Sequence, residues 1–198
     1  MKKKLLLGIL LSTTVYTFAQ DRNWSVDVNY PINLNGSGVL NGIDGTIDVG
    51  LKYRFLHTDI VHLGLAVSGG FTSDSPGPNN SDTFKSRTYF FQPKIFAEFD
   101  LPIVSKLHPN VGLGYSVVSF NYSGSIGTTD FSNRGNTDGG LNSEAGLSYD
   151  ITSRFFVQAQ YDLIRLQVKD EVVFDGERVN FDFDESISRL KVGVGFRF

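Results

Sequence analysis

The sequence of 198 residues contains no cysteine and only three histidines. Without cysteine it can form no disulfide, thiolate metal site or thiol nucleophile, and no lipid anchor on an N-terminal cysteine. Basic runs are also scarce, because 18 basic residues face 21 acidic ones and three of the basic residues are Lys2, Lys3 and Lys4. A chain that cannot neutralise a row of phosphates is unsuited to nucleic acid, so we expect no nucleic-acid partner.

Long apolar runs are missing after residue 20, where no stretch reaches the roughly 18 apolar residues of a spanning helix. Residues 1–19 differ, with a lysine cluster, an apolar run from Leu5 to Val15, and the small residues Thr17 and Ala19. This order predicts a secretory signal peptide, cleaved after Ala19 or one residue later. Residues 20–198 then form one domain, in which 21 acidic residues outnumber 15 basic ones.

Period-two alternation of apolar and polar residues is the dominant pattern of this domain, and it indicates strands rather than helices. In the last repeat, the apolar residues of "LKVGVGFRF" occupy every second position from Leu190 to Phe198. The pattern predicts eight strands, at residues 24–31, 46–55, 62–71, 89–99, 110–117, 141–151, 155–163 and 190–198.

The connections between these strands alternate in length. Those after the second, fourth and sixth strands are short, whereas the others are long and rich in Gly, Asn, Asp and Ser. In an up-and-down meander all short turns then lie at one end, which is typical of outer-membrane barrels with short periplasmic turns and long external loops. The predicted fold is therefore all-β, an eight-stranded antiparallel up-and-down transmembrane β-barrel with extracellular long loops.

A soluble lipocalin-like barrel would show the same alternation with its apolar residues inside. Two features favour the opposite orientation. Aromatic residues such as Trp24, Tyr53, Tyr89, Tyr149 and Phe155 gather near strand ends, as in the girdles at the two membrane boundaries. The other face combines glycine with charges that nearly cancel, as a poorly hydrated interior requires. We expect the interior to hold Asp27, Asp48, Glu98, Asp100, Glu144, Asp150 and Asp162, with Lys52, Arg54, Lys94, Arg189, Lys191 and Arg197.

The signal peptide, eight meandering strands, glycine-punctuated walls and terminal "VGVGFRF" together resemble the small OmpA/OmpX-like outer-membrane β-barrel family. The resemblance covers residues 21–198. It implies a chain surrounded by outer-membrane lipid and lipopolysaccharide and assembled by the barrel-assembly machinery. It further implies that this machinery reads a signal formed by Leu190, Val192, Val194, Phe196 and Phe198.

Eight strands enclose only enough space for side chains or one small ligand. With charged residues inside, we expect a plugged lumen rather than a wide pore. If a four-residue turn at 175–178 joins the last two strands, Asp162 lies opposite Lys191 as an interior ion pair. A register two residues different would remove that pair.

Some small outer-membrane barrels are enzymes, usually with a histidine general base near the external rim. Here His57 and His108 fall in short turns, and His62 opens a strand from the same end. Residues 72–82 and 182–185 offer oxygen ligands without the spacing of a calcium loop. We therefore expect no catalytic residue, cofactor or metal. A lipid-modifying enzyme and a narrow small-solute pore remain the alternatives.

The last long connection alternates again around Asp175-Gly176, with Val172, Phe174, Val179 and Phe181 on either side. Asp-Gly in such a setting is a strong hairpin signal, so strands seven and eight are predicted to extend as a ribbon. An exposed ribbon edge can pair with a strand of another protein. Residues 169–185 carry seven acidic residues against Lys169 and Arg178. We thus expect a surface-protein partner, cationic in character, or divalent ions that bridge the ribbon to lipopolysaccharide. The predicted role is envelope integrity or surface adhesion.

Overall fold

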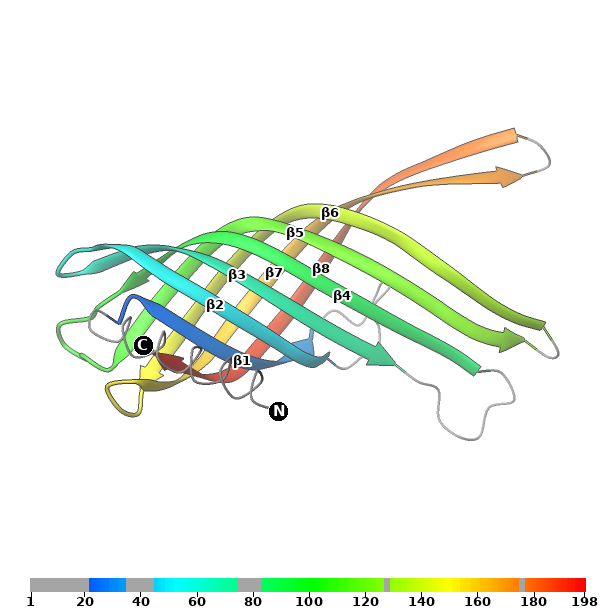
Figure 1. The fold of residues 1–198 in the computed structure, drawn as a ribbon. Coiled ribbons are helices and arrows are strands. Elements are labelled where there is room, and N and C mark those ends of the chain that lie inside the picture. Colours follow the sequence, from blue (N-terminus) through cyan, green and yellow to red (C-terminus); the bar gives the residue numbers. More distant parts are fainter. Residues whose placement is uncertain (1–21, 35–44, 75–82, 127–128, 175–176) are drawn as a thin grey trace, which may run out of the picture.

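The computed structural model describes residues 22–34, 45–74, 83–126, 129–174 and 177–198. They form a closed antiparallel barrel in which every strand pairs with its sequence neighbours (Figure 1). The predicted fold class and strand number are confirmed. The strands are β1 (Trp24–Asn33), β2 (Gly45–His57), β3 (Val61–Asp74), β4 (Thr83–Phe99), β5 (Leu107–Ile126), β6 (Thr129–Asp150), β7 (Phe155–Phe174) and β8 (Glu177–Arg197). None of the described residues belongs to a helix long and apolar enough to cross a membrane. Residues 1–21, with the predicted signal peptide, lie outside the described ranges.

The barrel closes where β1 pairs with β8. Val28 lies opposite Val194, and Ser25 lies opposite Arg197. At the end of this seam the backbone N–H of Phe198 donates to the carbonyl of Trp24 at 2.9 Å, and that of Trp24 donates back at 3.2 Å. Because the barrel is closed, the backbone N–H and C=O groups of the wall are paired between strands. A sheet can cross a lipid bilayer only under this condition.

The two faces of the wall are inverted relative to a water-soluble protein. On β4, Phe91 and Ile95 are exposed while Gln92 and Lys94 are buried. Aromatic rings pair on the outer surface near the end that carries the three short turns, at residues 58–60, 100–106 and 151–154. There the rings of Trp24 and Tyr53 lie 4.6 Å apart, and those of Phe155 and Phe196 lie 4.9 Å apart. We call this end the short-turn end and the opposite end the long-strand end.

Strands β5 and β6 are much longer than predicted. Residues 121–140 were expected to form a loop, but they continue the hairpin up to the pairing of Ile126 with Thr129. This expectation was wrong because the strand ends were predicted from the alternation of apolar residues. That alternation stops where the strands leave the lipid, although the strands themselves continue. A strand pair satisfies its backbone hydrogen bonds whatever side chains it carries, so it can continue through a polar sequence.

The predicted ribbon is present, since β7 and β8 stay paired up to Phe174 and Glu177. Only two residues lie between that pair, so the four-residue turn that would place Asp162 opposite Lys191 is not the one present. The register is accordingly shifted by two: Asp162 lies opposite Arg189, and Gln160 lies opposite Lys191. In Figure 1 the outer part of the β7–β8 hairpin diverges from the β5–β6 hairpin at the long-strand end.

Candidate functional site: a sealed lumen and an external ribbon

A charged layer fills the middle of the lumen, and Lys191 on β8 lies at its centre. This side chain is 1% exposed. Its Nζ lies 2.8 Å from Glu144 Oε2, 3.7 Å from Asp162 Oδ2 and 3.9 Å from Asp48 Oδ1. Lys94 binds the same oxygen of Glu144. Asp162 and Lys191 are thus within ion-pair distance across the lumen, although they are not cross-strand neighbours.

The cross-strand partner of Asp162, Arg189, forms the closer ion pair with it, and both side chains are fully buried. Gln92 joins them, donating from Nε2 to Asp162 at 3.2 Å and accepting from Arg189 at 3.1 Å. Asn142 donates a further hydrogen bond to Asp162. A buried carboxylate is tolerated only with partners of this kind, so the layer behaves as one connected unit.

A second charged layer lies nearer the short-turn end. Nε and an Nη of Arg54 each lie 3.0 Å from an oxygen of Glu98, in the bidentate geometry that favours arginine. Arg197 lies 3.7 Å from Glu98 and also binds Asp150. Its guanidinium carbon sits 4.6 Å from the centre of the Phe156 ring. Aromatic rings therefore take part in the lumen filling beside the charges.

The buried charges balance. Among the described side chains, the buried carboxylates are Asp27, Asp48, Glu98, Asp138, Glu144 and Asp162, and the buried cations are Lys52, Arg54, Lys94, Arg189, Lys191 and Arg197. Two expected interior acids, Asp100 and Asp150, lie instead at the rim, where they are partly exposed. Asp138, which was not expected in the interior, is buried. The prediction missed it because it assigned residue 138 to a loop.

The rim at the short-turn end holds a chain of polar contacts. Asp100 lies 2.8 Å from Nε2 of His62 and 2.6 Å from Nδ1 of His108. Nε2 of His108 lies 3.1 Å from Asp150. Partial burial raises the pKa of Asp100, but the hydrogen bonds from both histidines outweigh it and hold the pKa below its ordinary value. Within the described part of the chain, no group of three or more potential metal ligands has metal-binding geometry.

An apolar cluster fills the lumen on the other side of the central layer. It consists of Phe90, Val118, Phe120, Ile164, Leu166 and Ile187. The guanidinium of Arg189 lies 4.1 Å from the Phe90 ring centre, which joins this cluster to the charged layer. Sequence reasoning missed the cluster, since it expected polar residues along the whole interior. The signal was present as adjacent apolar pairs, such as Leu163-Ile164, in which one residue faces each side.

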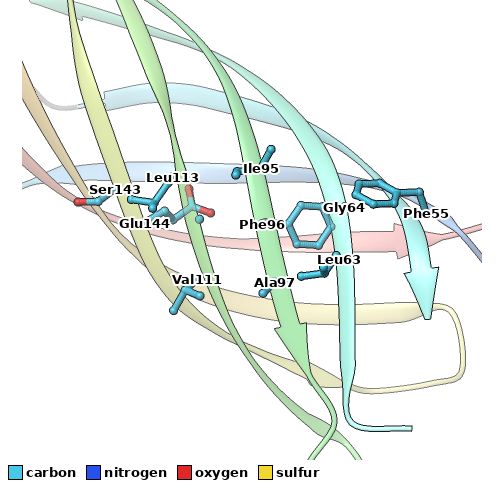
Figure 2. Close-up of a pocket in the computed structure, with 11 residues that line it drawn as sticks. Phe55, Leu63, Gly64, Ile95, Phe96, Ala97, Val111, Leu113, Ser143 and Glu144 are labelled. Atoms are coloured by element: carbon cyan, nitrogen blue, oxygen red, sulfur yellow. The ribbon is translucent and has the colours of Figure 1, made fainter. Parts of the chain in front are cut away.

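The hollow found between the described interior side chains is small. A hollow bordered by Lys52, Lys94, Glu144 and Lys191 has a volume of about 10 Å³, which is room for a single water molecule. The larger hollows lie on the outer wall, with volumes of about 490 and 690 Å³. Figure 2 shows the first, where Phe55, Leu63, Ile95 and Leu113 surround an apolar groove. A groove of that composition on this wall contacts hydrocarbon, so it is not evidence for a catalytic pocket.

The ribbon carries the other candidate residues. Pairing of β6 with β7 ends at Gly139 and Gln167, and pairing of β1 with β8 ends at Asn33 and Arg189. One more contact follows on the β1 side, where the backbone N–H of Leu34 donates to the carbonyl of Ser188 at 2.9 Å. Farther out, within the described residues, β7 and β8 form strand pairs only with each other. Of the four predicted partner-binding residues, Val172 and Val179 lie opposite each other, Phe174 lies opposite Glu177, and Phe181 lies opposite Asp170. No third strand of the described ranges pairs with this outer part of the ribbon.

The last strand presents its predicted assembly residues to the outside. Val192 and Val194 are 47% and 60% exposed, and Leu190, Phe196 and Phe198 are half-buried on the same face. Recognition by the barrel-assembly machinery stays a prediction. A closed eight-stranded wall with an apolar outside and a charge-paired inside defines an integral outer-membrane barrel.

The comparisons with known proteins agree with this class. Residues 5–198 match the outer membrane protein beta-barrel domain family, and the chain belongs to that family. Among solved structures it is similar to Neisserial surface protein A, at 19% identity and a TM-score of 0.53 over 88% of this chain and 96% of that one. It is also similar to Ail, the attachment invasion locus protein of Yersinia pestis, at 15% identity and a TM-score of 0.54 over 88% and 97%. No curated protein matches the chain.

Proposed function

We propose that this chain is a non-enzymatic outer-membrane barrel that adds a sealed element to the envelope and binds partners through the β7–β8 ribbon. Its long-strand end faces the cell exterior in this proposal. The observation that carries it is the contrast between the two ends of β7 and β8. Inside the wall these strands carry paired charges of the lumen. Beyond the wall they pair with each other and with no third strand of the described ranges.

The filled lumen supports the non-conducting part of the proposal. Lys191, Glu144, Asp162 and Arg189 are all nearly or fully inaccessible. Moving any of them to open a path would separate opposite charges in a low-dielectric interior, which is strongly unfavourable. The histidines also lie at the short-turn end, away from the long-strand rim where a lipid-modifying site would be expected.

The ribbon supports the binding part of the proposal. A strand edge offers a row of backbone hydrogen-bond donors and acceptors to a partner. Residues 169–185 of the ribbon carry seven acidic groups and two basic ones. We therefore infer a partner that contributes an extended segment with cationic side chains.

The test is deletion of residues 170–184. Leu166 and Glu185 remain paired in this variant, and residues 167–169 become a three-residue connection. We expect a folded barrel whose electrophoretic mobility still changes on heating, together with loss of binding to a fluorescent polylysine probe in lipid vesicles. Deletion of residues 75–82 is the matched control and should retain binding. Equal polylysine binding by all three proteins would contradict the ribbon's role.

A further inference from the structure

The outer face of β7 changes character at Arg165. Phe155, Val157 and Tyr161 are exposed apolar residues along this face, and Arg165 is the first exposed charge after them. Its cross-strand neighbour Leu141 is 71% exposed. An arginine facing lipid is strongly unfavourable at the bilayer midplane and nearly tolerated near the interface. Arg165 therefore marks the level where hydrocarbon gives way to lipid headgroups.

A recess of about 400 Å³ opens at this level on the outer wall. Its floor is backbone, because β6 carries glycine at positions 139 and 140 there. Tyr115 reaches over this floor from β5: a Cβ on Gly139 would lie 2.3 Å from the Tyr115 hydroxyl. Arg165 on β7 and Ser186 on β8 line the recess with it. The recess is thus polar toward the long-strand end and apolar at Leu141.

Arg165 has no carboxylate of a described residue within ion-pair distance, unlike the buried arginines of the lumen. A guanidinium of this kind binds phosphate through two parallel hydrogen bonds, and the Tyr115 hydroxyl can add a third. Asp184 also lines the recess, so a bound phosphate would feel its repulsion.

We propose that this recess binds a phosphate of lipid A, the lipid part of lipopolysaccharide, with Arg165 as the main ligand and Leu141 against the acyl chains. The assignment to this lipid rests on the proposed orientation, which places the recess in the outer leaflet. A phosphorylated glycolipid presents its phosphate directly above its acyl chains, as the recess requires.

The test is native mass spectrometry of the refolded full chain in micelles, titrated with diphosphoryl lipid A in the presence of a chelator. Arg165→Gln should weaken lipid A binding about tenfold. Asp184→Asn should strengthen it, because it removes the repulsive carboxylate. The matched control, Arg154→Gln, changes an exposed arginine in a turn at the other end and should bind as the unaltered protein does.

Removal of the phosphates should weaken lipid A binding to the unaltered protein. The loss should be at least as large as the one that Arg165→Gln causes with diphosphoryl lipid A. Equal affinity of the unaltered and Arg165→Gln proteins for diphosphoryl lipid A overturns the site. Equal affinity of the unaltered protein for phosphatidylglycerol overturns the assignment to lipid A. A gel-mobility change on heating shows that each variant is folded.

The orientation is tested separately, because binding in micelles does not depend on it. Since the chain has no native cysteine, Asp59→Cys places a single thiol in an exposed turn at the short-turn end. A membrane-impermeant maleimide should label it only after the cells are permeabilised. Labelling in intact cells would reject the proposed orientation and leave the micelle result on the recess unaffected.

Discussion

At the scale of single residues, the interior depends on cations shared between carboxylates. Lys191 lies within ion-pair distance of Glu144 on β6, Asp162 on β7 and Asp48 on β2. The sequence showed that these residues face inward, because alternation assigns each strand position to one face. It did not show which charges meet, since contacts across the lumen depend on strand register and barrel shear as well as alternation.

Lys191→Met should strongly destabilise the barrel. The change keeps most of the side-chain volume but leaves three buried carboxylates short of a cation, and breaking a buried ion pair costs about 3–5 kcal/mol. Denaturant unfolding in lipid vesicles, followed by gel mobility, measures the loss. Lys106→Met, in an exposed turn, is the control and should change stability little. An unaltered unfolding midpoint for Lys191→Met would mean that the network contributes no net stability.

The rim cluster makes stability depend on acid pH. Asp100 has a lowered pKa in the folded protein, so its carboxylate contributes stability above the pKa of the unfolded chain, about 3.9. That contribution disappears as the pH falls through the folded pKa. Asp100→Asn should therefore reduce stability at neutral pH and flatten its decline below pH 4, about where the unfolded carboxyl begins to titrate. Unfolding curves across this range measure it, with Asp59→Asn as control. Parallel pH profiles of Asp100→Asn and the unaltered protein would contradict the assignment.

At the scale of elements, alternation predicted the lipid-facing wall well and the rest of each strand poorly. Ile95 and Val194 were assigned to the outside because each alternates with polar neighbours, and both are exposed. Ile164 and Leu166 were missed because their neighbours Leu163 and Arg165 give no consistent alternation. The ribbon was the exception among the extensions, since Asp175-Gly176 signals its hairpin directly.

One strand position tests how tightly the interior is packed. A Cβ added at Gly195 would lie 2.1 Å from the Phe156 ring, which in turn packs against Arg197. Gly195→Ala must displace that ring, so we expect a loss of about 1–3 kcal/mol in unfolding free energy. Gly69→Ala, on the outer face of the wall, is the control, because the atom nearest to its added Cβ is 3.8 Å away. Equal stability of the two variants would show that the Phe156 ring has room to move.

At the scale of the whole molecule, the filled interior predicts a barrel that does not conduct. Reconstituted in planar bilayers, the unaltered protein should show no steady nanosiemens-scale conductance. The physical reason is that the buried charged layers and the buried apolar cluster both fill the interior. A clear and persistent open state would instead favour the narrow-pore alternative.

The enzyme alternative has its own whole-molecule test. Lipid A from cells with and without the protein should give identical mass spectra, because the three histidines lie at the short-turn end, away from the proposed outer leaflet. Any change in acyl chains that depends on the protein would favour a lipid-modifying enzyme.

The position of Lys191 and Arg189 on the last strand also bears on how the barrel assembles. Until β8 arrives, Asp162 lacks its arginine and Asp48, Glu144 and Asp162 lack their shared lysine. A seven-stranded intermediate would therefore expose unneutralised carboxylates to the bilayer interior, where they are most unfavourable. Membrane insertion and closure of the β1–β8 seam should consequently occur together, as a single cooperative step that a chain lacking β8 cannot complete.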